Sequence, residues 1–141
     1  MSTDDVEIGH EIPRLEIVVT GDQVRRYAAA AHMPGQRFVS DEVARKEGLP
    51  GRILPCNMSM ALLSRMLHDW LPQARIERLG VTFRGIVQPD QKIRCSGFVT
   101  DRRETDDGIE LECDLILEQG GERRTTGLAV LRLGRGSSTR S

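Results

Sequence analysis

Few residues in this sequence could act as acids, bases or nucleophiles. His32 ends a run of alanines, and its imidazole could serve as a general base near neutral pH if the surrounding loop faces a site. A surface histidine at a helix end fits the same position. Cys56 directly precedes an apolar segment, where a helix N-terminus would make its thiol more nucleophilic. Because no base accompanies Cys56 in the sequence, a packed structural thiol is the favoured interpretation.

The other candidate groups have plainer interpretations. Asp41 and Glu42 open a predicted helix, where carboxylates interact favourably with the helix dipole, so an acid pair is not required to explain them. His68 is expected on the polar side of a helix or at a subunit contact, and His10 receives no role. No motif indicates a cofactor or a metal. The cysteines are Cys56, Cys95 and Cys113, an odd number without CxxC spacing. This pattern argues against a disulfide framework or a zinc site.

The composition excludes several functional classes. A formal net charge of -1 gives no electrostatic reason to expect nucleic acid or an anionic membrane as a partner. The first residues are acidic and polar, unlike a signal peptide, and no apolar run approaches the roughly 18 residues of a membrane helix. A cytoplasmic protein is expected. The 141 residues suit one domain over 1–141, with flexible ends over about 1–6 and 134–141.

The first third of the chain predicts a strand followed by two short helices. Residues 12–19 have the composition of a strand, and a helix should follow to about Ala31, with Thr20 or Asp22 as its cap. Met33 and the proline and glycine after it should break this helix. A second short helix is predicted over 41–46.

The most apolar segment lies over residues 57–71. A helix that is apolar on nearly all sides is one surrounded by protein, so this segment is the expected central helix. Asn57 is its expected cap, and Pro72 should end it. The methionines at 58, 60 and 66 fit either a plain core or a flexible acyl pocket, and the plain core is favoured.

After residue 72 the apolar period changes from about 3.6 to about 2, which indicates strands. Four such segments are present, over 81–87, 93–99, 109–117 and 125–133. Because short runs of turn residues separate them, the four strands should run antiparallel. An antiparallel sheet wrapped around one long buried helix satisfies this order of elements. The predicted fold class is therefore α+β.

Four pieces of the sequence, in order, carry a resemblance to a known family. They are YAAA at 27–30, DEVARKEGLPGRI at 41–53, MSMALL at 58–63 and VTFRGIVQPD at 81–90. Over about half the chain, from Thr20 to Asp90, the sequence resembles the MaoC-like (R)-specific enoyl-CoA hydratases and dehydratases. The resemblance implies the hotdog fold. It also implies an acyl thioester, carried by CoA or an acyl carrier protein, as substrate.

The resemblance implies a particular reaction site, and this sequence departs from it. In the family, an Asp and a His in the loop after the YAAA helix activate water for addition to an enoyl thioester, or run the reverse elimination. Without a gap in the alignment, the Asp falls on Met33 and the His on Phe38. Pro55 and Cys56 stand where the family usually has a His and a Gly before the central helix. The ordinary chemistry is therefore expected to be lost.

Three functions remain open at this point. The first is a non-catalytic partner subunit of a hydratase or dehydratase, in a homodimer or in a heteromer with a second MaoC-like subunit. The second is an active hydro-lyase with a rebuilt site, in which His32 replaces the missing base. The third is a binder of a small hydrophobic ligand. In the first two, backbone amides at the start of the central helix would bind the thioester, and the expected binding residues are Cys56, Asn57 and Met58.

Overall fold

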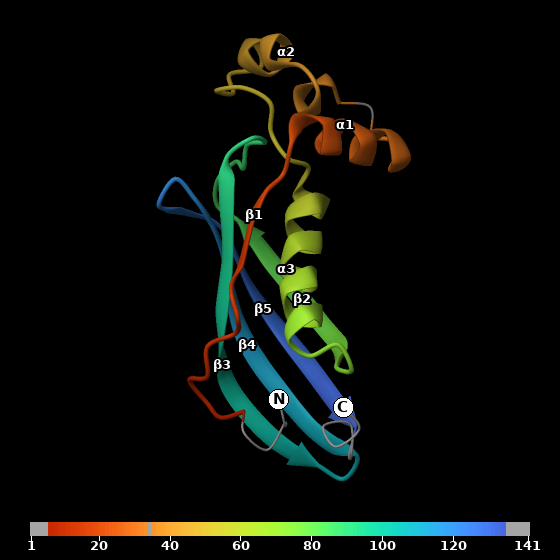
Figure 1. Ribbon diagram of the computed structural model, residues 1–141, viewed down its shortest axis with the longest axis vertical. Helices are drawn as coiled ribbons and strands as arrows, with labels where there is room; N and C mark the ends of the chain where they lie inside the picture. The colour runs from red at the N-terminus through yellow and green to blue at the C-terminus, as the bar shows by residue number, and fades with distance from the viewer. Residues whose placement is uncertain (1–5, 34, 135–141) are drawn as a thin grey trace.

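The computed structural model describes residues 6–33 and 35–134, and these form one antiparallel sheet, one long helix packed on it and a segment of shorter helices. The sheet curves around the long helix, and the shorter helices lie beyond one end of the sheet (Figure 1). In chain order the elements are β1 (Leu15–Val18), α1 (Gly21–Ala30), the 3₁₀ turn η2 (Gln36–Phe38), α2 (Asp41–Lys46), α3 (Cys56–Trp70), β2 (Arg75–Phe83), β3 (Lys92–Thr105), β4 (Gly108–Gln119) and β5 (Glu122–Gly134).

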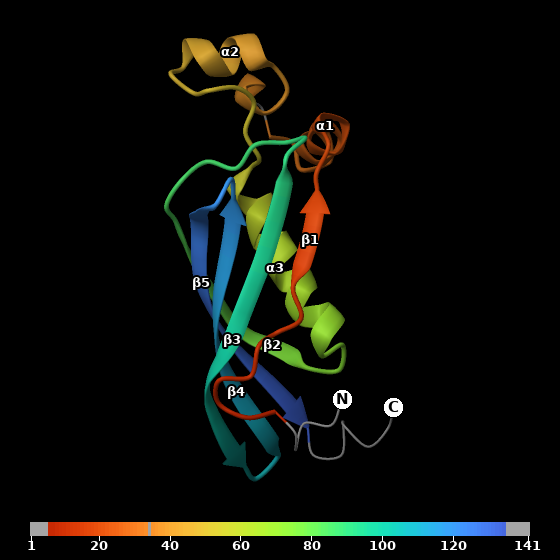
Figure 2. The ribbon, with the colours of Figure 1, turned by 60° about the vertical axis from the view of Figure 1, so that its left-hand side comes forward.

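The strand order in the five-stranded sheet is β1-β3-β4-β5-β2, so β1 and β2 are its two edges. Consecutive strands β3, β4 and β5 form two hairpins through the turns at 105–108 and 119–122. The left-handed glycines Gly108, Gly120 and Gly121 lie in these turns, with φ values of 155°, 63° and 79°. Figure 2 shows β1 on the far side of β3 from β4. This arrangement confirms the predicted hotdog fold and the α+β class.

The core lies between the inner face of the sheet and α3. In β4, buried residues alternate with more exposed ones from Leu111 to Gln119, so every second side chain there belongs to the inner face of the sheet. The buried residues of α3 lie on one side of the helix, where Leu63 is fully buried at its middle, and the opposite side with Ala61 and Arg65 is exposed. The expectation that protein surrounds this helix on nearly all sides was therefore wrong within this chain. Pro72 follows the last turn, since a proline cannot continue the helix. The predicted central helix is therefore confirmed, with a start one residue earlier than expected.

All five predicted strands have different bounds in the structure. The strand expected over 81–87 was wrong: β2 begins at Arg75, and the chain leaves the sheet after Phe83. A register shift between Ile76 and Arg78 breaks the alternation of β2, so its pattern in the sequence does not read as a strand. The strand expected over 12–19 is shorter, because Pro13 lacks the N–H that a ladder requires. The hairpin strands β3, β4 and β5 are longer than expected.

The outermost described residues at both ends have contacts in the fold, and the flexibility expected over about 1–6 and 134–141 stays a prediction. Val6 is fully buried in the core, and Gly134 pairs with Gly108 across β5 and β4. Residues 1–5 and 135–141 lie outside the described residues, as does Pro34. The ordered start of the chain crosses β3, where the amide of Ile12 donates a 2.9 Å hydrogen bond to the carbonyl of Gly97.

Candidate functional site

Several of the residues singled out by the sequence lie in the part of the chain that leads into α3. Residues 19–55 leave the sheet after β1, form α1, η2 and α2, and return to begin α3 (Figure 1). We call residues 19–55 the helical segment. Its helices lie beyond the N-terminal end of α3, which is the end toward which that helix's N–H groups point. The geometry of the segment therefore decides what reaches the start of α3.

Helix α1 begins at a complete capping box. The side chain of Thr20 accepts a 3.1 Å hydrogen bond from the amide of Gln23, and the Gln23 side chain accepts a 2.8 Å bond from the amide of Thr20. This reciprocal pair satisfies two of the N–H groups that a helix start leaves open. Of the two expected caps, Thr20 is confirmed and Asp22 lies in the first turn. Val24 and Ala28 form the buried side of the helix.

The loop after α1 carries the positions of the expected dyad. Met33 is half-buried, and its amide donates a 2.8 Å hydrogen bond to the carbonyl of Ala28. Phe38, at the end of η2, is also half-buried and packs against the hydrophobic core. Its ring lies so close to Gly35 that a Cβ there would come within 2.9 Å of it. Both dyad positions therefore carry half-buried apolar side chains, and neither side chain can donate or accept a proton.

Arg52 connects the helical segment to the turn before β3. Its backbone amide donates a 2.9 Å hydrogen bond to Asp41, and its guanidinium lies 3.3 Å from the carboxylate of Asp41 and 3.4 Å from that of Asp90. Asp90 in turn accepts a 3.1 Å bond from the amide of Gly21. The bond from the Arg52 amide lowers the pKa of Asp41. A Cβ at Gly21 would come within 2.3 Å of the guanidinium, so a glycine leaves room for this contact.

The start of α3 has no side-chain cap. Pro55 occupies the cap position, and its carbonyl accepts hydrogen bonds from the amides of Met58 and Ser59. The expected cap was wrong: Asn57 lies inside the first turn, exposed, because Cys56 already has helical geometry. Among the described residues, no group accepts from the amides of Cys56 and Asn57. Two donors at the positive end of the helix dipole are thus available to a ligand oxygen.

The three cysteines have different environments. Cys56 is exposed at the start of α3, whereas Cys95 and Cys113 are buried on the inner face of the sheet. Burial raises the pKa of each buried thiol to about 12, so both stay protonated at neutral pH. The interpretation of Cys56 as a packed thiol was therefore wrong about its burial. Because its side chain faces solvent, packing does not explain its position.

The three histidines do not gather at one place. His10 stacks on Trp70 at a centroid distance of 5.9 Å, at the end of α3 opposite to Cys56. His68 is exposed on the last turn of α3, as expected. His32 is exposed in the loop after α1 and has a left-handed backbone, with a φ of 54°. Only His32 therefore belongs to the helical segment that carries the dyad positions.

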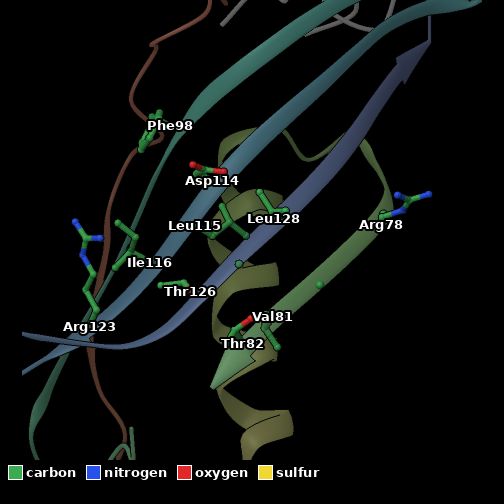
Figure 3. Close-up of a pocket in the computed structure, with 12 residues that line it drawn as sticks. Arg78, Val81, Thr82, Phe98, Asp114, Leu115, Ile116, Arg123, Thr126 and Leu128 are labelled. Carbon is green, nitrogen blue, oxygen red and sulfur yellow. The ribbon is translucent and has the colours of Figure 1, made fainter. Parts of the chain in front are cut away.

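One groove of the molecule lies where the sequence indicated no site. A groove of about 620 Å³ runs over the outer face of the sheet, across β2, β5, β4 and β3 (Figure 3). The available signal was apolar side chains at outward positions of the strands, Phe98 and Leu128, which are both exposed. In the described ranges 6–33 and 35–134, no cluster of three metal-ligating side chains is present. Across these same ranges, no helix has the length and apolar character needed to cross a membrane.

The fold and the organisation of the site define a hotdog protein in which a helical segment covers the start of the central helix. The sequence matches the MaoC like domain family over residues 5–120, and the chain therefore belongs to this family. The family match confirms the resemblance found in the sequence. A comparison of the sequence with curated proteins gives no significant match.

Solved structures of hydratases and dehydratases share the fold. The (R)-hydratase from A. caviae involved in PHA biosynthesis superposes with a TM-score of 0.84 at 21% identity, over 93% of this chain and 99% of that one. The ChsH1-ChsH2 complex from Mycobacterium tuberculosis gives 0.80 at 18% identity, over 90% and 98%. The HadBC (3R-hydroxyacyl-ACP dehydratase) complex from the same organism gives 0.74 at 17% identity, over 88% and 95%.

Proposed function

We propose that this chain is a non-catalytic partner subunit of a MaoC-like hydratase or dehydratase that acts on enoyl-CoA or a related acyl thioester. The observation that carries the proposal is the pair of apolar side chains, Met33 and Phe38, at the positions where the family's Asp and His are expected. Adding water to a double bond requires a base that takes a proton and an acid that returns one. Half-buried thioether and phenyl groups supply neither.

Thioester binding is the function that this site could retain. The free amides of Cys56 and Asn57 point from the start of α3 toward the helical segment, where a thioester carbonyl could accept from them. Met58 follows in the same turn, is half-buried and packs against the core, so it would contact the acyl chain. These three residues are the proposed binding residues. They would hold the acyl thioester while a partner subunit supplies the proton transfers.

The edge strand β2 supports a partner that continues the sheet. One side of β2 pairs with β5 over eight residue pairs, and no described strand pairs with its other side. A nine-residue edge leaves a row of N–H and C=O groups open, whereas the other edge, β1, has four residues. We expect a second MaoC-like subunit, or a second copy, to pair there. Light scattering at micromolar concentration should show a dimer or larger assembly, and a monomer would contradict this expectation.

A hydratase assay tests the loss of chemistry. The chain alone should hydrate crotonyl-CoA and a bulkier enoyl-CoA at background rates, because each missing acid–base group typically contributes about 10²–10⁴-fold. Met33→Asp combined with Phe38→His should raise the rate. The control combines Met33→Asp with Arg37→His, which places the imidazole at an exposed neighbouring position, and should stay at background. Adding a MaoC-like subunit with an intact Asp and His should give a rate that depends on this chain.

Two outcomes would replace the proposal with its alternatives. Enzyme-like turnover by the unmodified chain, abolished by His32→Ala, would mean an active hydro-lyase with His32 as the base of a rebuilt site. The exposure of His32 in the dyad loop is what keeps this alternative open. Absence of thioester binding, alone and with a MaoC-like partner, would instead favour a binder of a small hydrophobic ligand.

A further inference from the structure

The groove on the outer face of the sheet lies away from the start of α3 and has a defined arrangement. One row of paired residues crosses four strands: Gly80 on β2 pairs with Leu128 on β5, Leu128 with Asp114 on β4, and Asp114 with Phe98 on β3. All four line the groove. Figure 3 shows three of them, Leu128, Asp114 and Phe98, on adjacent strands. Because the inner face is filled by α3, these side chains belong to the face that the fold leaves uncovered.

The row places a projection beside a hollow. Leu128 is 62% exposed, the largest exposed fraction of an aliphatic side chain on the described strands. Its neighbour Gly80 has no side chain, and a Cβ there would meet no atom within 4 Å. The backbone of Gly80 is not left-handed, so the fold of the chain itself does not require a glycine. A surface with one projection and one adjacent hollow can match a copy of itself.

The same face also carries one acidic and one basic side chain that form no ion pair within the described part of the chain. Asp114 lies next to Leu128 on one side, and Arg78 precedes Gly80 by two residues on the same face of β2. Neither side chain forms a hydrogen bond or an ion pair with another residue of the described ranges. In a two-fold contact, residue i of each copy touches residue j of the other. One acidic and one basic side chain, each without an ion pair, meet this requirement because they can pair twice across such an interface.

We propose that the outer face of the sheet is a two-fold interface with a second copy of this chain. Leu128 of each copy enters the hollow over Gly80 of the other. The two-fold axis lies between the sheets and runs along the strands, between β5 and β2, so that β5 of each copy faces β2 of the other. Strand β4 of one copy then lies just beyond the other copy's edge strand β2, where Asp114 can pair with that copy's Arg78. Side chains from two facing sheets interdigitate in this way when the sheets pack about 10 Å apart. The interface is separate from edge pairing through β2 and from the thioester site.

Molar mass by light scattering tests the projection and the hollow separately. The variant Leu128→Glu should have half the molar mass of the unmodified protein. Gly80→Val, which fills the hollow without adding charge, should also have half of it. The control is Ile8→Glu, because Ile8 is 64% exposed but does not line the groove, and its mass should equal that of the unmodified protein. An unchanged mass in Leu128→Glu would overturn the proposal, as would an unmodified protein that is a monomer.

Charge reversal tests the pairing between copies. Asp114→Arg and Arg78→Asp should each weaken the assembly at least tenfold, and the double variant should restore it, because the pair is rebuilt with its signs exchanged. A double variant as weak as the single ones would overturn the Asp114–Arg78 contact. These masses do not depend on hydratase activity. An active enzyme with the expected masses would contradict the proposed function and leave this interface standing.

Discussion

The sheet with α3 and the helical segment are held in place by different forces. In the first, apolar side chains from the inner face of the sheet and from α3 form one continuous buried cluster. In the second, α1 and α2 bury only small residues and one valine: Gly21, Val24, Ala28 and Ala44. Hydrogen bonds and ion pairs through Arg52 tie the segment to the rest of the chain. Burial fixes the sheet and α3, whereas the helical segment combines a few core contacts, through Val24 and Leu54, with these polar ones.

This difference explains how a family fold can persist while its chemistry changes. The dyad positions, Met33 and Phe38, lie in a loop of the helical segment, outside the sheet and α3. Phe38 packs against the outside of the buried cluster, so substitutions at these two positions leave the fully buried residues of α3 and the inner face in place. The available amides at the start of α3 depend on the helix itself, and so they survive such substitutions. The proposed loss of the acid–base groups and the proposed retention of thioester binding therefore involve different parts of the structure.

The largest effect is expected from the core. Leu63→Ala should lower the free energy of unfolding by about 2–5 kcal/mol, through lost burial and the cavity left behind. Arg65→Ala, on the exposed side of the same helix, is the matched control and should change it by less than about 0.5 kcal/mol. Chemical denaturation measures both. A loss below about 1 kcal/mol for Leu63→Ala would show that α3 does not fill the sheet as described.

A local effect of intermediate size is expected at Arg52. Arg52→Met keeps the aliphatic stem but removes the ion pairs with Asp41 and Asp90, so α1 and α2 should open more often. Hydrogen exchange in these helices should rise on the order of tenfold, the effect of one or two kcal/mol of local stability, without a change in β3, β4 and β5. Arg45→Met, which lies on the exposed side of α2, is the control. Equal acceleration throughout the sheet would erase the distinction between the two regions.

The smallest expected effect is a fall in thermal stability as the pH is lowered. Hydrogen bonds from Arg103 and Arg132 lower the pKa of Glu110 on β4, just as the bond from Arg52 lowers the pKa of Asp41. Because both folded-state values lie below the ordinary 4.5 and 3.8, their stabilisation is present above these values and lost as the pH falls through the folded ones. The Tm should therefore decline between about pH 5 and about pH 3. Glu110→Gln should make this decline shallower, and an unchanged slope would contradict the assignment.

The sequence predicted the elements whose pattern is regular. The central helix was found because its first half is apolar on almost every side, and β4 because apolar residues recur at every second position from Ile109 to Leu117. The bounds of β2 were missed because a bulge after Ile76 shifts its alternation. The cap of α3 was missed because Pro55 leaves the helix start without a side-chain signature. A pattern along the chain does not reveal features that depend on pairing between strands.

The candidate site was predicted only in its place within the fold. Sequence spacing located the loop of Met33 and Phe38 and the start of α3, and the structure describes both in one region. The link through Arg52 was not predicted, because Asp41 and Asp90 are far from each other in the sequence. The outer groove was missed for the same reason: Gly80 and Leu128 become neighbours only when β2 pairs with β5. The roles of these residues stay predictions until the assays are done.

The pairing of β2 with β5 also sets the order in which this protein can fold during synthesis. Strand β2 leaves the ribosome directly after α3, but β5, its only described sheet neighbour, ends at Gly134. Until then α3 has no complete sheet to cover it, and its apolar surface is exposed on the nascent chain. Contacts between segments distant in sequence form slowly, and exposed apolar surface invites aggregation or chaperone binding. A ribosome stalled before β5 should therefore carry a chain that is sensitive to protease.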